Sequence, residues 1–139
     1  RSNFEKLSER VRQRLTLEND DVVYTVADLH PVCNDLGIPL VYDVHHHRCH
    51  PDGLTAEEAT GIAVETWAKA GREPYFHISS PEQGWEAKNP RRHGDYVEFR
   101  DFPGFWMNLT ATIDVEARAK ELAVLKLMRD LLQTGESPH

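Results

Sequence analysis

The chain has 139 residues and a formal net charge of −7, with 16 Lys and Arg against 23 Asp and Glu. This length suits one domain but falls well short of the roughly 250 residues of a complete eight-stranded α/β barrel. The acidic balance argues against nonspecific nucleic-acid binding by the whole surface, because phosphate contacts require clustered basic side chains. No apolar stretch approaches the roughly 18 residues of a membrane span, so we expect a soluble protein without a membrane partner.

The two cysteines, Cys33 and Cys49, are too few for a disulfide framework, and the sequence has no signal-peptide pattern. We therefore expect a cytoplasmic protein. Cys49 and His50 could bind zinc, but no CxxC pair accompanies them, so a structural zinc site is not expected. The chain begins at Arg1 without an initiator methionine, and we expect it to be part of a larger protein.

The N-terminal third predicts two helices and one strand. Apolar residues at spacings of three and four indicate an amphipathic helix over residues 3–14, which leads into a strand at about 14–18. A second helix is expected over 26–36, with Thr25 or a neighbour as its cap and Gly37 as its stop.

The middle of the chain alternates between strands and a capped helix. A strand from Ile38 to Asp43 is followed by a histidine-rich loop. Thr55 with Glu58 three residues later forms a capping box, which predicts a helix that runs to about Ala70. The next strand is expected over Pro74 to Ser79, and a polar loop over Ser80 to Pro90.

The C-terminal part predicts one more strand and helix. Residues 95–102 are ambiguous between a helical turn and a short strand, whereas 110–115 indicates a strand and 117–132 a helix with a broad apolar face. We expect one domain over 1–132 and a frayed tail over 133–139. The strand and helix alternation predicts an α/β fold of parallel βα units.

Four of the apolar runs end in, or contain, a carboxylate or a histidine: Leu15 to Glu18, Ile38 to Asp43, Tyr75 to Ile78 and Thr110 to Glu116. Such side chains at the tips of neighbouring strands can converge on one point. Asp43 and His46 offer a carboxylate and an imidazole, which suit Zn²⁺ or Mn²⁺. Clustered carboxylates repel one another without a counter-charge, so the pattern indicates a polynuclear metal site.

Each of these residues also has an ordinary structural interpretation. The three histidines His45 to His47 could be a solvated loop, and His45 and His47 are better placed to support the ligands or contact substrate. Glu18 could be an exposed turn residue and His77 a core histidine. The run Lys88 to His93 could be a surface basic patch, or its arginines could contact phosphate while His93 binds a metal.

Three segments carry a resemblance to a known family: Leu17 to Asp20, Gly37 to His47 and Phe76 to Ser80. In order and spacing they resemble the UV-damage endonuclease family, within the endonuclease IV-like barrel superfamily. The similarity covers residues 2–132 and implies the C-terminal half of a TIM-type (β/α)8 barrel. It also implies a DNA repair enzyme that nicks UV-damaged double-stranded DNA 5′ to photoproducts and leaves a 3′-hydroxyl.

The resemblance further implies up to three divalent cations, most often Mn²⁺, with Zn²⁺ or Mg²⁺ as alternatives. A metal-activated water would attack the phosphodiester, with no side chain as nucleophile. The matching motifs imply that Glu18 bridges two cations and that Asp43 and His77 bind one of the cations that Glu18 binds. Glu116 would complete this cluster. The same motifs imply that His46 and His93 hold a further metal.

The resemblance places the pair Arg91 and Arg92 close to the DNA backbone. Tyr75 stands where related bacterial enzymes can carry a chemically modified lysine; it cannot be carboxylated, but it can hydrogen-bond a phosphate or a metal-bound water. The residues that wedge into the duplex at a lesion belong to the missing half of the family's barrel.

Two other functions remain open from the sequence. Sugar isomerases and epimerases on the same scaffold arrange two Glu, one Asp and one His around metals, although the arginine-rich loop and extra histidines favour phosphodiester cleavage. The chain could also be a metal-binding fragment without activity. Half a barrel would expose two sheet edges, which can pair with another copy or with the missing half, so a homo-oligomer or extensive crystal contacts are expected.

Overall fold

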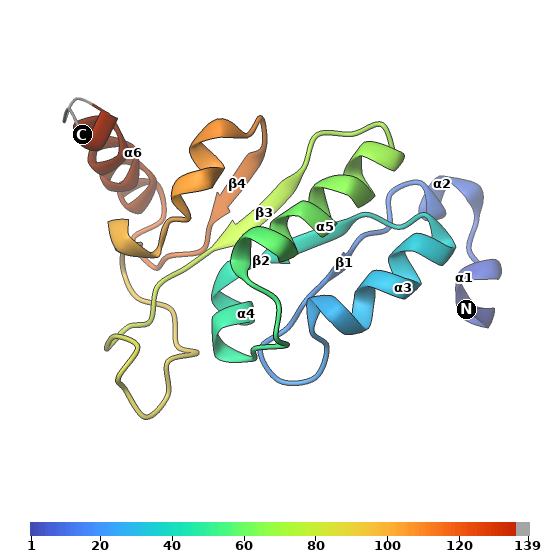
Figure 1. The fold of residues 1–139 in the computed structure, drawn as a ribbon, viewed down its shortest axis with the longest axis horizontal. Helices are drawn as coiled ribbons and strands as arrows, with labels where there is room; N and C mark the ends of the chain where they lie inside the picture. Colours follow the sequence, from blue (N-terminus) through green and yellow to red (C-terminus); the bar gives the residue numbers. More distant parts are fainter. Residues whose placement is uncertain (136–139) are drawn as a thin grey trace.

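Four parallel strands form one sheet in the order β1-β2-β3-β4 in the computed structural model, which describes residues 1–135 (Figure 1). Their bounds are β1 Leu17–Glu18, β2 Leu40–Asp43, β3 Tyr75–Ile78 and β4 Thr112–Val115. In the parallel register, Glu18 lies beside Val41, Asp43 beside His77, and His77 beside Asp114. The predicted progression of parallel βα units is therefore confirmed.

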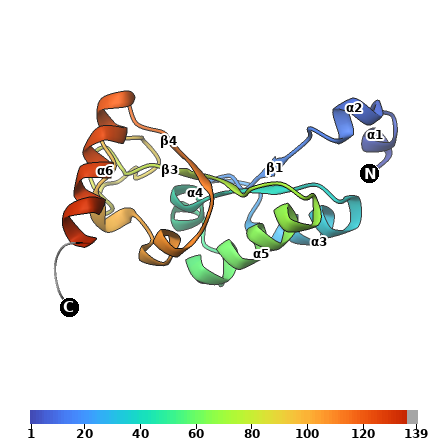
Figure 2. The ribbon, with the colours of Figure 1, turned by 90° about the horizontal axis from the view of Figure 1, so that it is seen from above.

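Helices α3 (Val26–Leu36) and α5 (Ala56–Lys69) cover one face of this sheet (Figures 1 and 2). Both begin where predicted, because Thr25 and Thr55 each form a capping box with the acidic residue three positions later. Gly37 ends α3 in the left-handed conformation, at a φ of 67°. The core between helices and sheet is apolar and includes Val26, Leu29, Leu40, Tyr42, Ala59, Ala63, Phe76 and Ile78.

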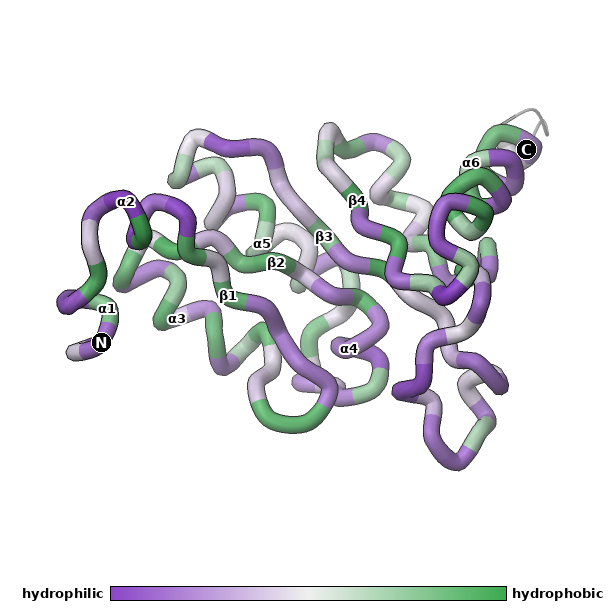
Figure 3. The backbone as a smooth tube through the Cα atoms, turned by 180° about the vertical axis from the view of Figure 1, so that it is seen from behind, coloured by the Kyte–Doolittle hydropathy of each residue, from purple (hydrophilic) through white to green (hydrophobic). Residues whose placement is uncertain are grey.

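The other face of the sheet is covered by no helix of residues 1–135, as Figure 3 shows from behind. On β3, Phe76 and Ile78 are fully buried in the core, so the alternation of a strand turns Tyr75 and His77 to the open face. Neighbours in register share a face, and this places the side chains of Asp43 and Asp114 beside that of His77. The open face therefore carries the polar side chains of the strands.

The N-terminal helix predicted over 3–14 is wrong: the segment forms two short helices, α1 (Ser2–Glu5) and α2 (Glu9–Arg12). Ser8 breaks the pattern because its side chain accepts a hydrogen bond from the backbone N–H of Val11 and so caps α2. The following strand is also shorter than the predicted 14–18, since only the two residues of β1 pair with β2.

The histidine-rich segment after β2 is a helix, α4 (Val44–Cys49), and not the predicted loop. Asp43 Oδ1 accepts a hydrogen bond from the backbone N–H of His46 at 2.8 Å, and this cap turns the chain from strand directly into helix. His45 and His47 are buried, which excludes a solvated loop.

The ambiguous stretch 95–102 contains a short 3₁₀ helix, η1 (Phe99–Asp101), and a second one, η2 (Gly104–Asn108), was not predicted. The second positions Trp106, whose ring stacks on Phe76 with centroids 5.1 Å apart. Helix α6 spans Glu121–Gly135, so it begins later and ends later than the predicted 117–132. Residues 136–139 of the predicted tail lie outside the described part of the chain.

No helix within residues 1–135 is long and apolar enough to cross a membrane. Strands β1 and β4 are the edges of the sheet in the described chain, each with one neighbouring strand. Association of copies through these edges stays a prediction, as does the domain boundary at residue 132.

Candidate metal centre

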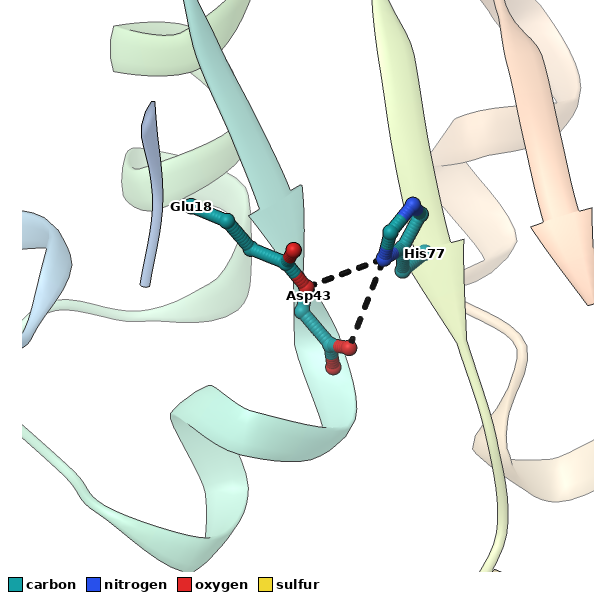
Figure 4. A group of neighbouring side chains, drawn as sticks. All are labelled: Glu18, Asp43 and His77. Atoms are coloured by element: carbon teal, nitrogen blue, oxygen red, sulfur yellow. Dashed lines mark hydrogen bonds and ion pairs between the residues drawn. The ribbon is translucent and has the colours of Figure 1, made fainter. Parts of the chain in front are cut away.

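The side chains of Glu18, Asp43 and His77 converge at the carboxyl ends of three adjacent strands (Figure 4). His77 Nδ1 lies 2.9 Å from Glu18 Oε1 and 4.0 Å from Asp43 Oδ2. Each residue offers one ligand atom, and these atoms all lie within 4.8 Å of one another. This is the kind of donor set, oxygen and imidazole nitrogen, that binds a divalent cation.

Asp43 is the most strongly held member of this group. The side-chain amide of Asn19 makes two hydrogen bonds to the backbone of Asp43, both at 2.9 Å. Its Nδ2 donates to the Asp43 carbonyl, and its Oδ1 accepts from the Asp43 N–H. Asp43 is fully buried, and while Oδ1 caps α4, Oδ2 has no hydrogen-bond partner within residues 1–135. Burial raises the pKa of Asp43, although His46 opposes the shift. A buried carboxylate oxygen without a partner fits a bound cation.

His77 stands between four carboxylates. Besides its contacts with Glu18 and Asp43, Nδ1 lies 3.3 Å from Glu116 Oε1, and Nε2 lies 3.8 Å from Asp114 Oδ2. Burial lowers the pKa of His77, but the hydrogen bond and charge of Glu18, with the charges of Glu116 and Asp43, outweigh burial and raise it. When it is protonated, the His77 ring supplies a positive charge among these carboxylates, and it must lose its proton to become a metal ligand.

His46 and His93 lie at the margin of this group. His46 Nδ1 is 3.3 Å from Asp43 Oδ2 and 3.7 Å from Glu18 Oε1, whereas His93 Nδ1 is 3.9 Å from Glu116 Oε2. The centroids of the two imidazole rings are 6.5 Å apart. Two rings on one ion, with nitrogens about 2.0–2.1 Å from it, reach this separation only when they lie on opposite sides of the ion, so in a tetrahedral site the two rings would have to move closer together.

Asp114 was missed by the sequence reasoning, which considered only carboxylates at strand ends. It lies on β4, in register with His77, and forms a second potential ligand group with His77 and Glu116. The sequence spacing could have identified Asp114, because it precedes Glu116 by two residues and residues two apart on a strand share a face. Tyr75 lies beside this group, with its ring 5.4 Å from His77, and burial, reinforced by Asp114, raises the pKa of Tyr75.

The two neighbouring arginines have different surroundings. Arg91 Nε lies 3.7 Å from Asp21 Oδ2, whereas the exposed Arg92 has no acidic partner within 4 Å among residues 1–135. Arg92 borders a hollow of about 410 Å³ whose other lining residues are Glu82, Gln83, Lys88 and Asn89. The negative charge of Glu82 is already paired, since Arg118 donates a hydrogen bond to it at 2.7 Å. The hollow is therefore locally basic.

The remaining two histidines of α4 lie behind the ligands. His47 hydrogen-bonds the Tyr42 hydroxyl at 2.6 Å and the Asp52 carboxylate at 2.9 Å, so it holds α4 against the core. The ring centroid of His45 is 5.3 Å from that of His93. Burial, with the nearby His93, lowers the pKa of His45 to about 4, so this ring is neutral near pH 7.

A parallel α/β sheet with carboxylates and imidazoles gathered at the strand ends defines an α/β protein with a candidate metal centre. The chain belongs to the UV-endonuclease UvdE family, whose model matches residues 1–137.

Curated relatives are named UV DNA damage endonuclease. Those of Bacillus cereus strain Q1 and Bacillus thuringiensis subsp. konkukian strain 97-27 are 34% and 33% identical to this chain over 134 residues. The crystal structure of SacUVDE superposes with a TM-score of 0.82 at 27% identity and covers 98% of this chain. The chain spans 41% of each of these relatives and 45% of SacUVDE. The predicted family and the predicted partial α/β barrel are both confirmed.

Proposed function

We propose that this chain provides the metal-binding part of an endonuclease that nicks DNA 5′ to UV photoproducts and leaves a 3′-hydroxyl. The observation that carries the proposal is the buried Oδ2 of Asp43, which accepts no hydrogen bond within residues 1–135 and lies beside Glu18 and His77 at the carboxyl ends of the strands. Family membership supports DNA as the substrate, since the relatives are named for UV DNA damage.

Glu18, Asp43, His77 and Glu116 would hold one or two divalent cations, and His46 with His93 would hold a further one. Mixed carboxylate and imidazole donors suit Mn²⁺, with Zn²⁺ or Mg²⁺ as alternatives. Such a cation, when bound, lowers the pKa of water and offsets the negative charge of a phosphodiester.

The protein's own residues fix the geometry of this reaction. Asn19 holds the Asp43 backbone, and it follows Glu18 directly in the chain, so the backbone positions that carry these two carboxylates are tied to each other. Four acidic side chains around His77 repel a phosphodiester until cations or protons neutralise them. The side chains therefore bind and orient, and none of them is required as a nucleophile.

The test is nicking of an irradiated supercoiled plasmid by the protein at its natural full length, with Mn²⁺ present. We expect relaxed circles from the irradiated plasmid, none from the same plasmid without irradiation, and mapped breaks on the 5′ side of photoproducts. Isomerisation of aldoses or ketoses without nicking would replace the proposal by a sugar isomerase. Cation binding without any turnover would leave an inactive metal-binding protein.

The two arginines should contribute unequally to DNA binding. Changing Arg92 to Gln removes a guanidinium that has no acidic partner within 4 Å in the described part of the chain, so the slope of log affinity against log salt should become shallower by about 0.9. Arg91→Gln is the matched control, and its effect should be smaller because Asp21 already competes for this guanidinium. Duplex binding measured between about 50 and 200 mM salt checks this expectation. Equal losses for the two variants would contradict the distinction.

A further inference from the structure

A second hollow, of about 590 Å³, lies between α4 and η1 and contains none of the candidate metal ligands. Its lining includes Arg48, Trp85, Glu86, Arg100 and Asp101. The volume falls within the range of ordinary small-molecule sites and is sufficient for one nucleotide. Nothing in the proposed metal chemistry uses these residues.

Asp101 is a buried residue that holds two of the side chains lining this hollow, Arg48 and Trp85. It is 5% exposed, and its carboxylate accepts hydrogen bonds from Ser80 Oγ at 2.5 Å and from Trp85 Nε1 at 2.9 Å. Its backbone carbonyl accepts another from Arg48 at 2.8 Å. The guanidinium carbon of Arg48 lies 5.9 Å from the centroid of the Trp85 ring. One buried residue therefore fixes both an indole and a guanidinium, which makes this a preorganised site.

The free groups of the hollow suit a nucleotide. Trp85 is half-buried, whereas the other two tryptophans, Trp67 and Trp106, are 3% and 2% exposed in the core. Arg100 is exposed and has no acidic partner within 4 Å among residues 1–135. An indole beside a guanidinium accepts a flat base by stacking, and a second guanidinium at the rim accepts a phosphate. The Glu86 carboxylate can accept a hydrogen bond from an exocyclic amino group.

The hollow adjoins the candidate metal centre through a row of rings. The centroid of Trp85 lies 5.1 Å from that of His45, which lies 5.3 Å from that of His93. Consecutive nucleotides of one strand are about 3.4 Å apart along a duplex and farther apart when unstacked. A strand with one phosphate at the metal centre can therefore place a nearby nucleotide in the hollow.

We propose that this hollow is a subsite for one unstacked nucleotide of the DNA strand being cut. Its base lies against Trp85 and Arg48, and its phosphate is bound by Arg100. The proposal rests on the proposed DNA substrate, and it names Trp85 and Arg100 as determinants of affinity for DNA whose stacking is already disrupted.

The experiment measures binding of a fluorescent duplex with a single pyrimidine dimer by anisotropy, with Ca²⁺ in place of Mn²⁺, so that a cation offsets the acidic side chains around His77 while the duplex is kept intact. Trp85→Ala should weaken binding by about 5- to 150-fold, as expected for loss of one stacked base. Its effect on the same duplex without the lesion should be several-fold smaller. Arg100→Gln should make the salt slope shallower by about 0.7 to 0.9.

Arg72→Gln is the matched control. Arg72 also lies over an indole, with its guanidinium carbon 5.0 Å from the centroid of Trp67, but on the turn after α5. The subsite is refuted if Trp85→Ala and Arg100→Gln bind like this control, or if the unmodified protein binds neither duplex. If the losses appear as expected but the protein with Mn²⁺ nicks nothing, the subsite stands and the proposed nuclease activity fails.

Discussion

Glu18→Gln is expected to lower nicking of irradiated DNA by at least about 100-fold while the protein stays folded. Loss of residues that merely support metal ligands already costs about 10- to 100-fold, and Glu18 offers its carboxylate directly to the group formed with Asp43 and His77. The fold should survive, because Glu18 is partly exposed and the amide retains its shape. Relaxation of irradiated plasmid over time, with Mn²⁺ in excess, gives the measurement.

Glu57→Gln is a suitable control for this experiment, because it makes the same chemical change on the helix-covered side of the sheet, in the first turn of α5. It should nick like the unmodified protein. Circular dichroism and thermal melting of both variants would show that the fold is intact. Full cleavage by Glu18→Gln would remove this residue from the proposed ligand set.

Mn²⁺ is expected to invert the dependence of stability on pH. Without metal, His77 has a pKa raised above its ordinary 6.5, so its contribution to stability is complete below pH 6.5 and is lost as pH rises through the folded-state pKa. The raised pKa of Asp43 acts in the same direction, because the folded state holds the proton longer than the unfolded chain. With Mn²⁺ the ligands must be deprotonated, so stabilisation grows as pH rises.

Thermal unfolding at several pH values from 6.5 upward, with Mn²⁺ or with EDTA, measures this inversion. Mn²⁺ at 100 times its dissociation constant adds about 2.7 kcal/mol, which raises the midpoint by roughly 5 to 15 °C in a chain of this size. Asp43→Asn should lose most of this increment, while Glu57→Gln should keep it. An unchanged midpoint with Mn²⁺ at every pH would argue against a metal centre in this chain.

Local signals in the sequence predicted the helices that cover the sheet. Thr25 and Thr55 begin α3 and α5 through contacts within four residues, and Gly37 ends α3 through its own backbone conformation. The same kind of signal was overlooked at Ser8, which caps α2. It was also overlooked at Asp43, where one carboxylate both ends β2 and caps α4. A residue with two local roles is difficult to assign when its ligand role is considered first.

The details of the site depend on contacts that no local pattern contains. The proximity of Glu18, Asp43 and His77 followed from parallel strands, but Asp114 becomes part of the group only through its register with His77. His93 reaches Glu116 from a long loop whose path is fixed by contacts such as Gly94 N–H to the Ser80 carbonyl, 2.7 Å. Loop geometry of this kind arises from tertiary packing, so the sequence could name the residue but not its position.

The side chain of Asn19 extends the hydrogen bonding between β1 and β2 by one position beyond the end of β1. It does so because its amide both donates to and accepts from the Asp43 backbone, as a paired strand residue would. The Asn19 carbonyl also accepts a hydrogen bond from His46 Nδ1 at 2.9 Å. One amide residue, only 1% exposed, thereby couples the movements of three neighbours on separate elements. We therefore expect a displacement of the loop after β1 to move Glu18, Asp43 and His46 together, so that these candidate ligands shift as a group.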